Sequence, residues 1–247
     1  MSDTSVVRAM RILELLAHTE KPVPLKDLAA ALDIPKSTAH GILRDLVQER
    51  FVDLKEPAAY TIGLKAFEVG SAHLRVAGFS GVVASELGRL CRALDLTAHY
   101  AVLDGTDAVY LYKQDPPGLG VQLASSVGAR LPSHLTAVGK SCLAWLEVAT
   151  VADHVVFAGA ADSSRGPEAD ALACELARVR ERGYSTDHGQ VALGIECVAA
   201  PVFDAGGPRG ALGVSYLHGA SSQVDDVAGA VRESAARLTS MLGGTVR

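Results

Sequence analysis

The stretch that decides the fold is 25-LKDLAAALDIPKSTAHGILRDLV-47. A helix starting near Leu25 would carry Leu28, Ala29 and Leu32 on its inner face, and it would end at Asp33-Ile34-Pro35, because the residue before a proline is pushed out of the α region. Ser37 is the expected N-cap of the next helix. The apolar stripe of that helix consists of Ala39, Ile42, Leu43, Leu46 and Val47. Two short helices joined by a tight turn predict a helix-turn-helix.

The outward face of the second of these helices indicates its use. Lys36, His40 and Arg44 are spaced i, i+4, i+8 and so lie on one side, next to Ser37 and Thr38 at the positively polarised helix start. A recognition helix presents such a face to phosphates and base edges. A simply solvated charged face is the alternative, since helix-turn-helix geometry also occurs in proteins that do not bind DNA.

The flanking segments favour DNA binding. Apolar residues recur at helical spacing over about 5–17. The segment Lys21-Pro22-Val23-Pro24 breaks this first helix and leads into the helix pair. After the pair come two apolar segments, 51–54 and 60–62, which flank the short stretch 55–59. The last two segments predict a hairpin, the wing of a winged helix.

The rest of the chain predicts a linker helix and a second domain. The expected organisation is a winged helix-turn-helix over residues 1–63, a linker helix over 64–78 and an effector-binding domain over 79–247. In the last, helices are expected at 82–94, 137–147, 150–157, 167–182 and 224–242, and strands at 98–103, 108–112, 121–124, 197–203 and 211–216. Strands grouped at both ends of a helical middle predict an α+β sensor fold with a mostly antiparallel sheet.

Composition excludes several classes of protein. With 49% hydrophobic residues, the 247-residue chain can bury real cores, and no apolar run approaches the ~20 residues of a membrane span. We expect a soluble, cytoplasmic protein. The four cysteines lie far apart and predict free thiols. Residues 1–75 hold 10 Lys+Arg and 10 Asp+Glu, so the remaining 13 and 18 place the whole net charge of -5 in residues 76–247.

The first 75 residues resemble the IclR family of bacterial transcriptional regulators. The matching segments are Val7-Arg8-Ala9-Met10-Arg11-Ile12-Leu13-Glu14-Leu15-Leu16, Leu28-Ala29 through Ile34-Pro35-Lys36-Ser37-Thr38, and Tyr60-Thr61-Ile62-Gly63-Leu64. The family usually has an arginine where this chain has Gly41, which costs ~1 kcal/mol of helix propensity relative to alanine and removes a DNA contact.

The resemblance covers nearly the whole chain. The stretch 128-GARLPSHLTAVGK-140 looks like the family's approach to the long helix of its effector domain, and Arg182-Gly183-Tyr184, Asp187 and 194-GIECVAAPVFD-204 match its C-terminal signature. The resemblance implies a GAF/PAS-like domain that binds small, mostly carboxylate-bearing metabolites. It also implies that Asp187, Cys197 and Ser215 converge on the effector. Gly213 stands where some members have a second serine, which predicts more room and a bulkier or less polar effector.

A helix starting after Thr136 supports an effector site at this place on physical grounds, independently of the resemblance. Its first N–H groups, those of Ala137 and Val138, would face whatever lies in front of the helix, which suits a carboxylate. Thr136 is the expected cap.

Three other interpretations remain open. Gly139-Lys140-Ser141 resembles the end of a phosphate-binding loop, but His134 stands where the first glycine would be, so Lys140 is expected to be structural or salt-bridged. Cys197 could be a nucleophile with His188 or His134 as base, although a thiol within an apolar strand is usually inert. His134, His188 and Cys197 could hold a metal, but they lack ligand spacing.

We therefore expect a ligand-responsive transcriptional regulator rather than an enzyme, without metal or cofactor. Its expected DNA contacts are Lys36, Ser37, Thr38, His40, Gly41 and Arg44 on the recognition helix, with Arg8 and Lys55 on the DNA backbone. The expected partners are a palindromic double-stranded operator, an organic acid and further copies of the chain, as a homodimer or dimer of dimers. The alternative is a small-molecule enzyme or metal-binding sensor whose helix-turn-helix is an interaction module.

Overall fold

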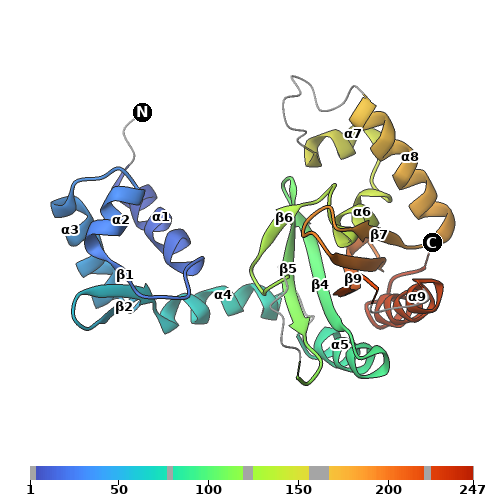
Figure 1. The fold of residues 1–247 in the computed structure, drawn as a ribbon, viewed down its shortest axis with the longest axis horizontal. Coiled ribbons are helices and arrows are strands. Elements are labelled where there is room, and N and C mark those ends of the chain that lie inside the picture. Colours follow the sequence, from blue (N-terminus) through green and yellow to red (C-terminus); the bar gives the residue numbers. More distant parts are fainter. Residues whose placement is uncertain (1–3, 77–79, 119–124, 156–166, 220–223, 247) are drawn as a thin grey trace. The chain divides into compact units, whose positions relative to one another are not determined.

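A computed structural model of the chain describes residues 4–76, 80–118, 125–155, 167–219 and 224–246 (Figure 1). Its contacts divide the chain into two compact units, Met1–Gly78 and Phe79–Arg247. Within the described residues, no helix is both long and apolar enough to cross a bilayer.

The first unit is a winged helix-turn-helix. Its elements are α1 (Ser5–Ala17), β1 (Val23–Pro24), α2 (Leu25–Ala31), α3 (Lys36–Gln48), β2 (Val52–Lys55), β3 (Ala59–Ile62) and α4 (Leu64–Val76). The three helices α1 to α3 pack around one core, made of Ile12, Leu16, Leu28, Leu43, Val52 and Tyr60. The strands form an antiparallel sheet in the order β1-β3-β2. The predicted helix pair and wing are therefore confirmed.

Two local predictions in this unit are wrong. Ser37 is not the cap of α3, because the helix begins at Lys36 and the carbonyl of Pro35 already accepts the N–H of Ala39 at 3.0 Å. The segment Lys21–Pro24, expected only to break the chain, supplies β1, in which Val23 pairs with Tyr60. This third strand ties the wing to the start of α2.

The second unit has one six-stranded sheet. Its elements are α5 (Ser80–Leu94), β4 (Thr97–Asp104), β5 (Asp107–Gln114), β6 (Arg130–Pro132), α6 (Ala137–Leu143), α7 (Val148–Val151), a 3-10 turn (Ala152–His154), α8 (Pro167–Arg182), β7 (Ser185–His188), β8 (Ile195–Asp204), β9 (Gly207–Leu217) and α9 (Val224–Met241). The strand order is β6-β5-β4-β9-β8-β7, and every pair is antiparallel. The α+β fold class is confirmed.

Helices cover the sheet from two sides. The helices α5 and α9 pack against each other and against the sheet, whereas α6 packs on β4, β8 and β9 with α8 behind it (Figure 1). Small residues such as Ala101, Ala199 and Ala211 line the strands under α6 and let that helix come close. The short helix α6 is therefore held directly over the centre of the sheet.

A buried carboxylate joins α5 to α9. Glu86 is 5% exposed, and its Oε1 accepts hydrogen bonds from Arg89 at 2.7 Å and from Arg237 at 3.0 Å. The hydroxyl of Ser234 accepts from both arginines. These hydrogen bonds and ion pairs fix the position of α5 along α9.

The predictions for the second unit are correct for long elements and incomplete for short ones. The expected helix over 137–147 ends at Leu143, and the short strands β6 and β7 were not expected. The expected strand 121–124 lies outside the described residues. All four cysteines are free thiols, as predicted.

Candidate functional site

The outward face of α3 carries the predicted DNA-binding side chains. Ala39 and Leu43 are fully buried and orient the helix, so that Lys36, Ser37, His40 and Arg44 are exposed and Thr38 is half-buried. The guanidinium of Arg44 is 3.0 Å from Asp45 Oδ1, and both side chains are about 70% exposed. Such an exposed pair contributes little stability, and DNA phosphates can replace Asp45 as the partner of Arg44.

Gly41 lies in the middle of this face. A Cβ added there would meet no atom within 4 Å. The glycine is therefore not required by packing, and it leaves a gap between His40 and Arg44 on the exposed surface.

The other two predicted DNA contacts lie on α1 and in the wing. Arg8 is half-buried, and its Nε has no hydrogen-bond partner among the described residues. Lys55 ends β2, exposed, with its Nζ 3.2 Å from Asp53. Both cations belong to the same unit as α3.

The second site is a small cavity between the sheet and the start of α6, here called the effector cavity. Its lining includes five of the six predicted effector residues: Ala137, Val138, Asp187, Cys197 and Ser215. The remaining lining residues are His99, Tyr110, Ser125, Leu131, Thr136, Val191, Ala192 and Ile195. The free space at its centre is about 20 Å³, enough for a water molecule.

The start of α6 presents free backbone donors to this cavity. Thr136 caps the helix as predicted, with its Oγ1 accepting the N–H of Gly139 at 3.0 Å and its carbonyl accepting that of Lys140 at 3.0 Å. The preceding N–H groups, of Ala137 and Val138, have no intrahelical acceptor because no turn precedes them.

Three polar side chains form a chain along the sheet side of the cavity. The hydroxyl of Ser215 lies 3.0 Å from Cys197 Sγ and 3.4 Å from His99 Nδ1. Burial raises the pKa of the Cys197 thiol to about 12 and lowers the pKa of His99 to about 3. All three groups are therefore neutral near pH 7.

Asp187 is the one formal charge among the described lining residues. It is 2% exposed, and its Oδ1 accepts the backbone N–H of Gln190 at 2.7 Å. Burial raises the pKa of this carboxyl, and the Gln190 N–H opposes that shift. The carboxylate thus fastens the segment after β7, whose Val191 and Ala192 close one side of the cavity.

Gly213 does not leave the room that the sequence led us to expect. It pairs with His99 across β9 and β4, and a Cβ at residue 213 would lie 2.9 Å from His99 Nε2 and 2.9 Å from the Val198 carbonyl oxygen. The ring of His99, 1% exposed, fills the space beside the glycine. The argument for a bulkier effector from this position is therefore wrong.

Sequence reasoning missed three lining residues with polar groups: His99, Tyr110 and Ser125. His99 and Tyr110 contact each other edge-on, with ring centroids 5.2 Å apart. Ser125 is 5% exposed, and its hydroxyl has no partner among the described residues. The pairing of β4 with β5 brings His99 and Tyr110 together, Ser125 comes from the loop before β6, and no local motif marks any of the three.

The three alternative sites find little support in the geometry. The Cys197 thiol contacts the hydroxyl of Ser215, and His188 lies 3.6 Å from Glu196, so His188 is not placed as a base for the thiol. In the described parts of the chain, no three His, Cys, Asp or Glu side chains are grouped so as to hold a metal ion. Lys140, expected to be structural or salt-bridged, is 5% exposed and has no carboxylate within 4.0 Å among the described residues; its Nζ donates to Gln190 instead.

A winged helix with exposed basic residues on α3, followed by a sheet domain with a small cavity, is typical of a transcriptional regulator of the helix-turn-helix type. Family models agree: the IclR helix-turn-helix domain matches residues 5–55, and the bacterial transcriptional regulator IclR C-terminal domain matches residues 73–240. The chain belongs to the IclR family.

Individual relatives support the same assignment. The chain is 32% identical to the HTH-type transcriptional regulator XynR of Escherichia coli, over 81% of this chain and 80% of XynR. It is 33% identical to the transcriptional repressor IclR of the same organism, over 81% of this chain and 74% of the repressor. Its homologues are transcriptional regulators and not enzymes.

Solved structures share the fold. An IclR regulator from Alicyclobacillus acidocaldarius has a TM-score of 0.78 at 30% identity, covering 98% of this chain and all of its own. An IclR homologue from Microbacterium hydrocarbonoxydans, solved with 4-hydroxybenzoate, has a TM-score of 0.80 at 21% identity, covering 97% of this chain and 99% of its own.

Proposed function

We propose that this regulator binds a palindromic operator through paired copies of α3, and that a small carboxylate-bearing metabolite in the effector cavity modulates this binding. The observation that carries the proposal is the cavity itself, where the N–H groups of Ala137 and Val138 meet the neutral polar chain of His99, Ser215 and Cys197.

The contacts on DNA divide into two kinds. Lys36, His40 and Arg44 on α3 would enter the major groove with Ser37, Thr38 and the open position at Gly41, whereas Arg8 and Lys55 would contact the backbone. Because one such domain reads only a few base pairs, two copies must act together.

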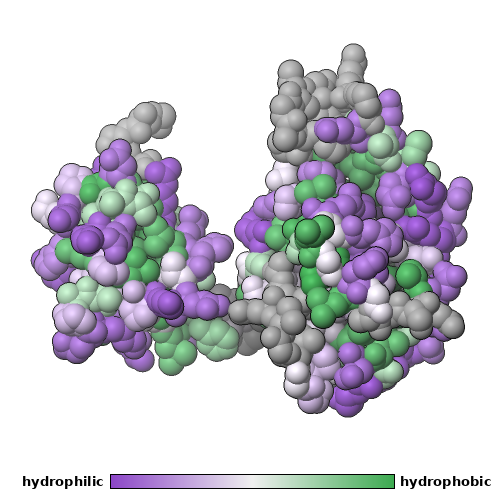
Figure 2. All heavy atoms as spheres, viewed as in Figure 1, coloured by the Kyte–Doolittle hydropathy of each residue, from purple (hydrophilic) through white to green (hydrophobic). Residues whose placement is uncertain are grey.

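Apolar surface supports the pairing of copies. Val6 and Met10 on α1 and Leu64, Phe67 and Val69 on α4 are exposed, with Phe67 at 69%. Figure 2 shows hydrophobic surface along α4. Contiguous exposed apolar side chains on a soluble unit mark an interaction surface, and a second copy is the partner that a palindrome requires.

The size of the cavity supports coupling between effector and DNA. About 20 Å³ does not hold a metabolite, so the effector must bind a form of the domain in which the cavity is larger. A ligand that binds one conformation better shifts the population toward it. The carboxylate would accept from the α6 N–H groups, and the unpartnered Ser125 hydroxyl would gain a hydrogen bond.

The test compares two functions in one protein. Arg44→Ala should weaken operator binding in a gel shift at least tenfold and leave the effector-induced rise in melting temperature unchanged. The control Arg92→Ala, the same charge change at an exposed position of α5, should leave both unchanged. Ser215→Ala should reduce the effector-induced rise in melting temperature and leave operator binding without effector unchanged. Operator affinity unchanged in Arg44→Ala would refute the assigned recognition helix.

The effector is found by a thermal-shift screen of carboxylic and aromatic acids, because a ligand that binds the native state raises its melting temperature. A hit should release or strengthen operator binding in the same concentration range. If every hit leaves operator binding unchanged, the proposed regulation is wrong even though the cavity binds acids.

A further inference from the structure

A second, larger cavity opens on the other side of α6. It has a volume of about 770 Å³ and lies between α8, β7 and the start of α6. We call it the Lys140 cleft; the residues used below are Lys140, Glu168, Glu175, Arg178, Arg182 and Gln190, all of which line it. It shares no lining residue with the effector cavity.

The decisive group is the ammonium of Lys140. This side chain is 5% exposed, and its hydrogen-bond partner among the described residues is the Gln190 side-chain oxygen, 2.8 Å from Nζ. No carboxylate of the described residues lies within 4.0 Å of it; Glu175 and Asp187 act on it only from farther away. Burial lowers the pKa of Lys140, and the more distant Glu175 and Asp187 oppose that shift.

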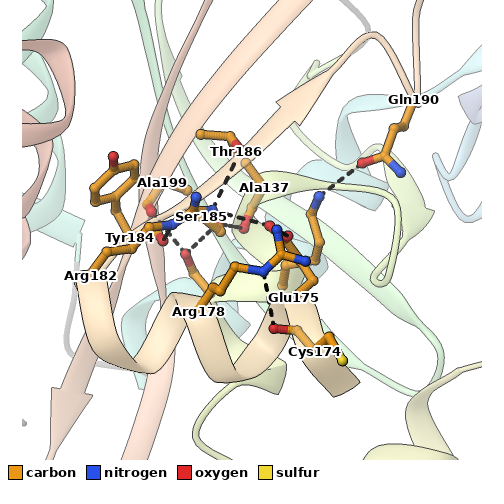
Figure 3. A network of polar contacts seen from close by, with 12 residues as sticks. Ala137, Cys174, Glu175, Arg178, Arg182, Tyr184, Ser185, Thr186, Gln190 and Ala199 are labelled. Atoms are coloured by element: carbon orange, nitrogen blue, oxygen red, sulfur yellow. Dashed lines mark hydrogen bonds and ion pairs between the residues drawn. The ribbon is translucent and has the colours of Figure 1, made fainter. Parts of the chain in front are cut away.

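The wall of the cleft adds two guanidinium groups. Arg182 Nη2 lies 3.1 Å from Glu175 Oε1, and Arg178 Nη1 lies 3.8 Å from Glu175 Oε2. Figure 3 shows Arg178, Glu175 and Arg182 gathered on α8, with Gln190 reaching in from beyond β7. Because one carboxylate serves two arginines, this wall retains a positive charge.

Glu168, the other acidic residue that lines the cleft, does not neutralise the charge of Lys140. Glu168 lies in the first turn of α8 and is exposed, whereas Lys140 is buried. A buried charge is usually paired, because removing it from water costs several kcal/mol. Among the described residues no carboxylate pairs with this ammonium, and Lys140 lines the cleft.

We propose that the Lys140 cleft is a second ligand site, which binds a small metabolite carrying a carboxylate or phosphate group as the counter-ion of Lys140. The volume lies within the range of small-molecule sites, about 300–1,000 Å³. The arginines of α8 would bind the outer part of the ligand, and the inner oxyanion would take the place of Gln190 at Nζ or share the ammonium with it.

The first experiment uses the full chain, with inorganic phosphate and citrate as probes and sodium chloride at equal ionic strength as the reference. Calorimetric titration should show binding that weakens at least tenfold in Lys140→Met. Arg92→Met, which removes an exposed cation on α5 that lines neither cavity, should bind the probes as the native protein does. Equal probe affinity in Lys140→Met and the native protein would overturn the proposal, as would the absence of probe binding at millimolar concentration.

Two further readouts separate a ligand site from a structural lysine. Lys140→Met should raise the melting temperature without ligand, because it removes an uncompensated buried charge; a lysine held for stability would give a fall. Gln190→Ala removes the competing acceptor and should tighten probe binding severalfold. If Gln190→Ala instead weakens binding, Lys140 is not the group that receives the anion.

Discussion

Gly139 and the carbonyl of Ser133 are in such close contact that no side chain fits between them. A Cβ added at Gly139 would overlap the carbonyl oxygen, the Cα and the carbonyl carbon of Ser133. This approach draws α6 against the segment before it, where Ser133 donates to the His154 carbonyl at 2.8 Å. The sequence Gly139-Lys140-Ser141, which resembles a nucleotide-binding motif, thus has a packing explanation for its glycine.

Gly139→Ala should destabilise the second unit by about 1–3 kcal/mol, because the added methyl overlaps backbone atoms that cannot rotate away. Urea unfolding followed by the fluorescence of Trp145, the one tryptophan of the chain, measures this. The matched control is Gly229→Ala on α9, where a Cβ meets nothing within 4 Å. The control should gain about 0.5–1 kcal/mol. Equal stability of the two variants would contradict the assigned contact.

Gly41→Ala should stabilise the first unit by about 0.5–1 kcal/mol, because alanine fits the open position and loses less backbone entropy than glycine. Circular dichroism should show a higher unfolding midpoint for this unit while the Trp145 transition stays in place. If the midpoint falls instead, Gly41 has a packing role that its open surroundings do not show.

His99 makes the second unit sensitive to acid. Its pKa is about 3 in the folded state and about 6.5 unfolded, so between these values the unfolded chain binds one more proton than the folded one. Stability from this group is complete above pH 6.5 and is lost as the pH falls toward 3, by up to about 1.4 kcal/mol per pH unit.

Urea titrations at pH 7 and pH 5 measure this loss, with His99→Asn as the variant that cannot titrate. The native protein should lose about 2 kcal/mol more than the variant over this interval. Lys113 and Asp115, the charges that act on His99, stay unchanged in both proteins. Equal losses would mean that His99 is protonated in the folded state.

Local pattern was sufficient for much of the fold. The helix over 167–182 and the helix over 5–17 were predicted with the bounds that the structure has. In such long segments the spacing of the apolar residues indicates both the helix and its buried face. The strands β6 and β7 escaped prediction because three or four residues hold too little alternation, and their partners β5 and β8 stabilise them from elsewhere in the chain.

The residues of the effector cavity also fall into two groups, those that local sequence predicts and those that it does not. Ala137 and Val138 could be predicted because the helix start itself supplies the chemistry, and Thr136 marks that start. His99 could not, since its place in the cavity depends on which strands pair with β4, and Ser125 could not, since it lies in a loop with no motif of its own. Ser37 was assigned wrongly because the helix begins one residue earlier, at Lys36, with Pro35 as an N-cap that has no side-chain hydrogen bond.

The fit of His99 against Gly213 restricts the order in which this cavity can change during evolution. A serine arriving first at residue 213 would collide with the imidazole as well as with the Val198 carbonyl. A smaller residue arriving first at 99 would leave a hole but relieve the crowding by the ring. A side chain at 213 therefore requires both a smaller residue at 99 and a shift of the backbone at Val198, and relatives with a side chain at 213 are expected to differ at 99 as well.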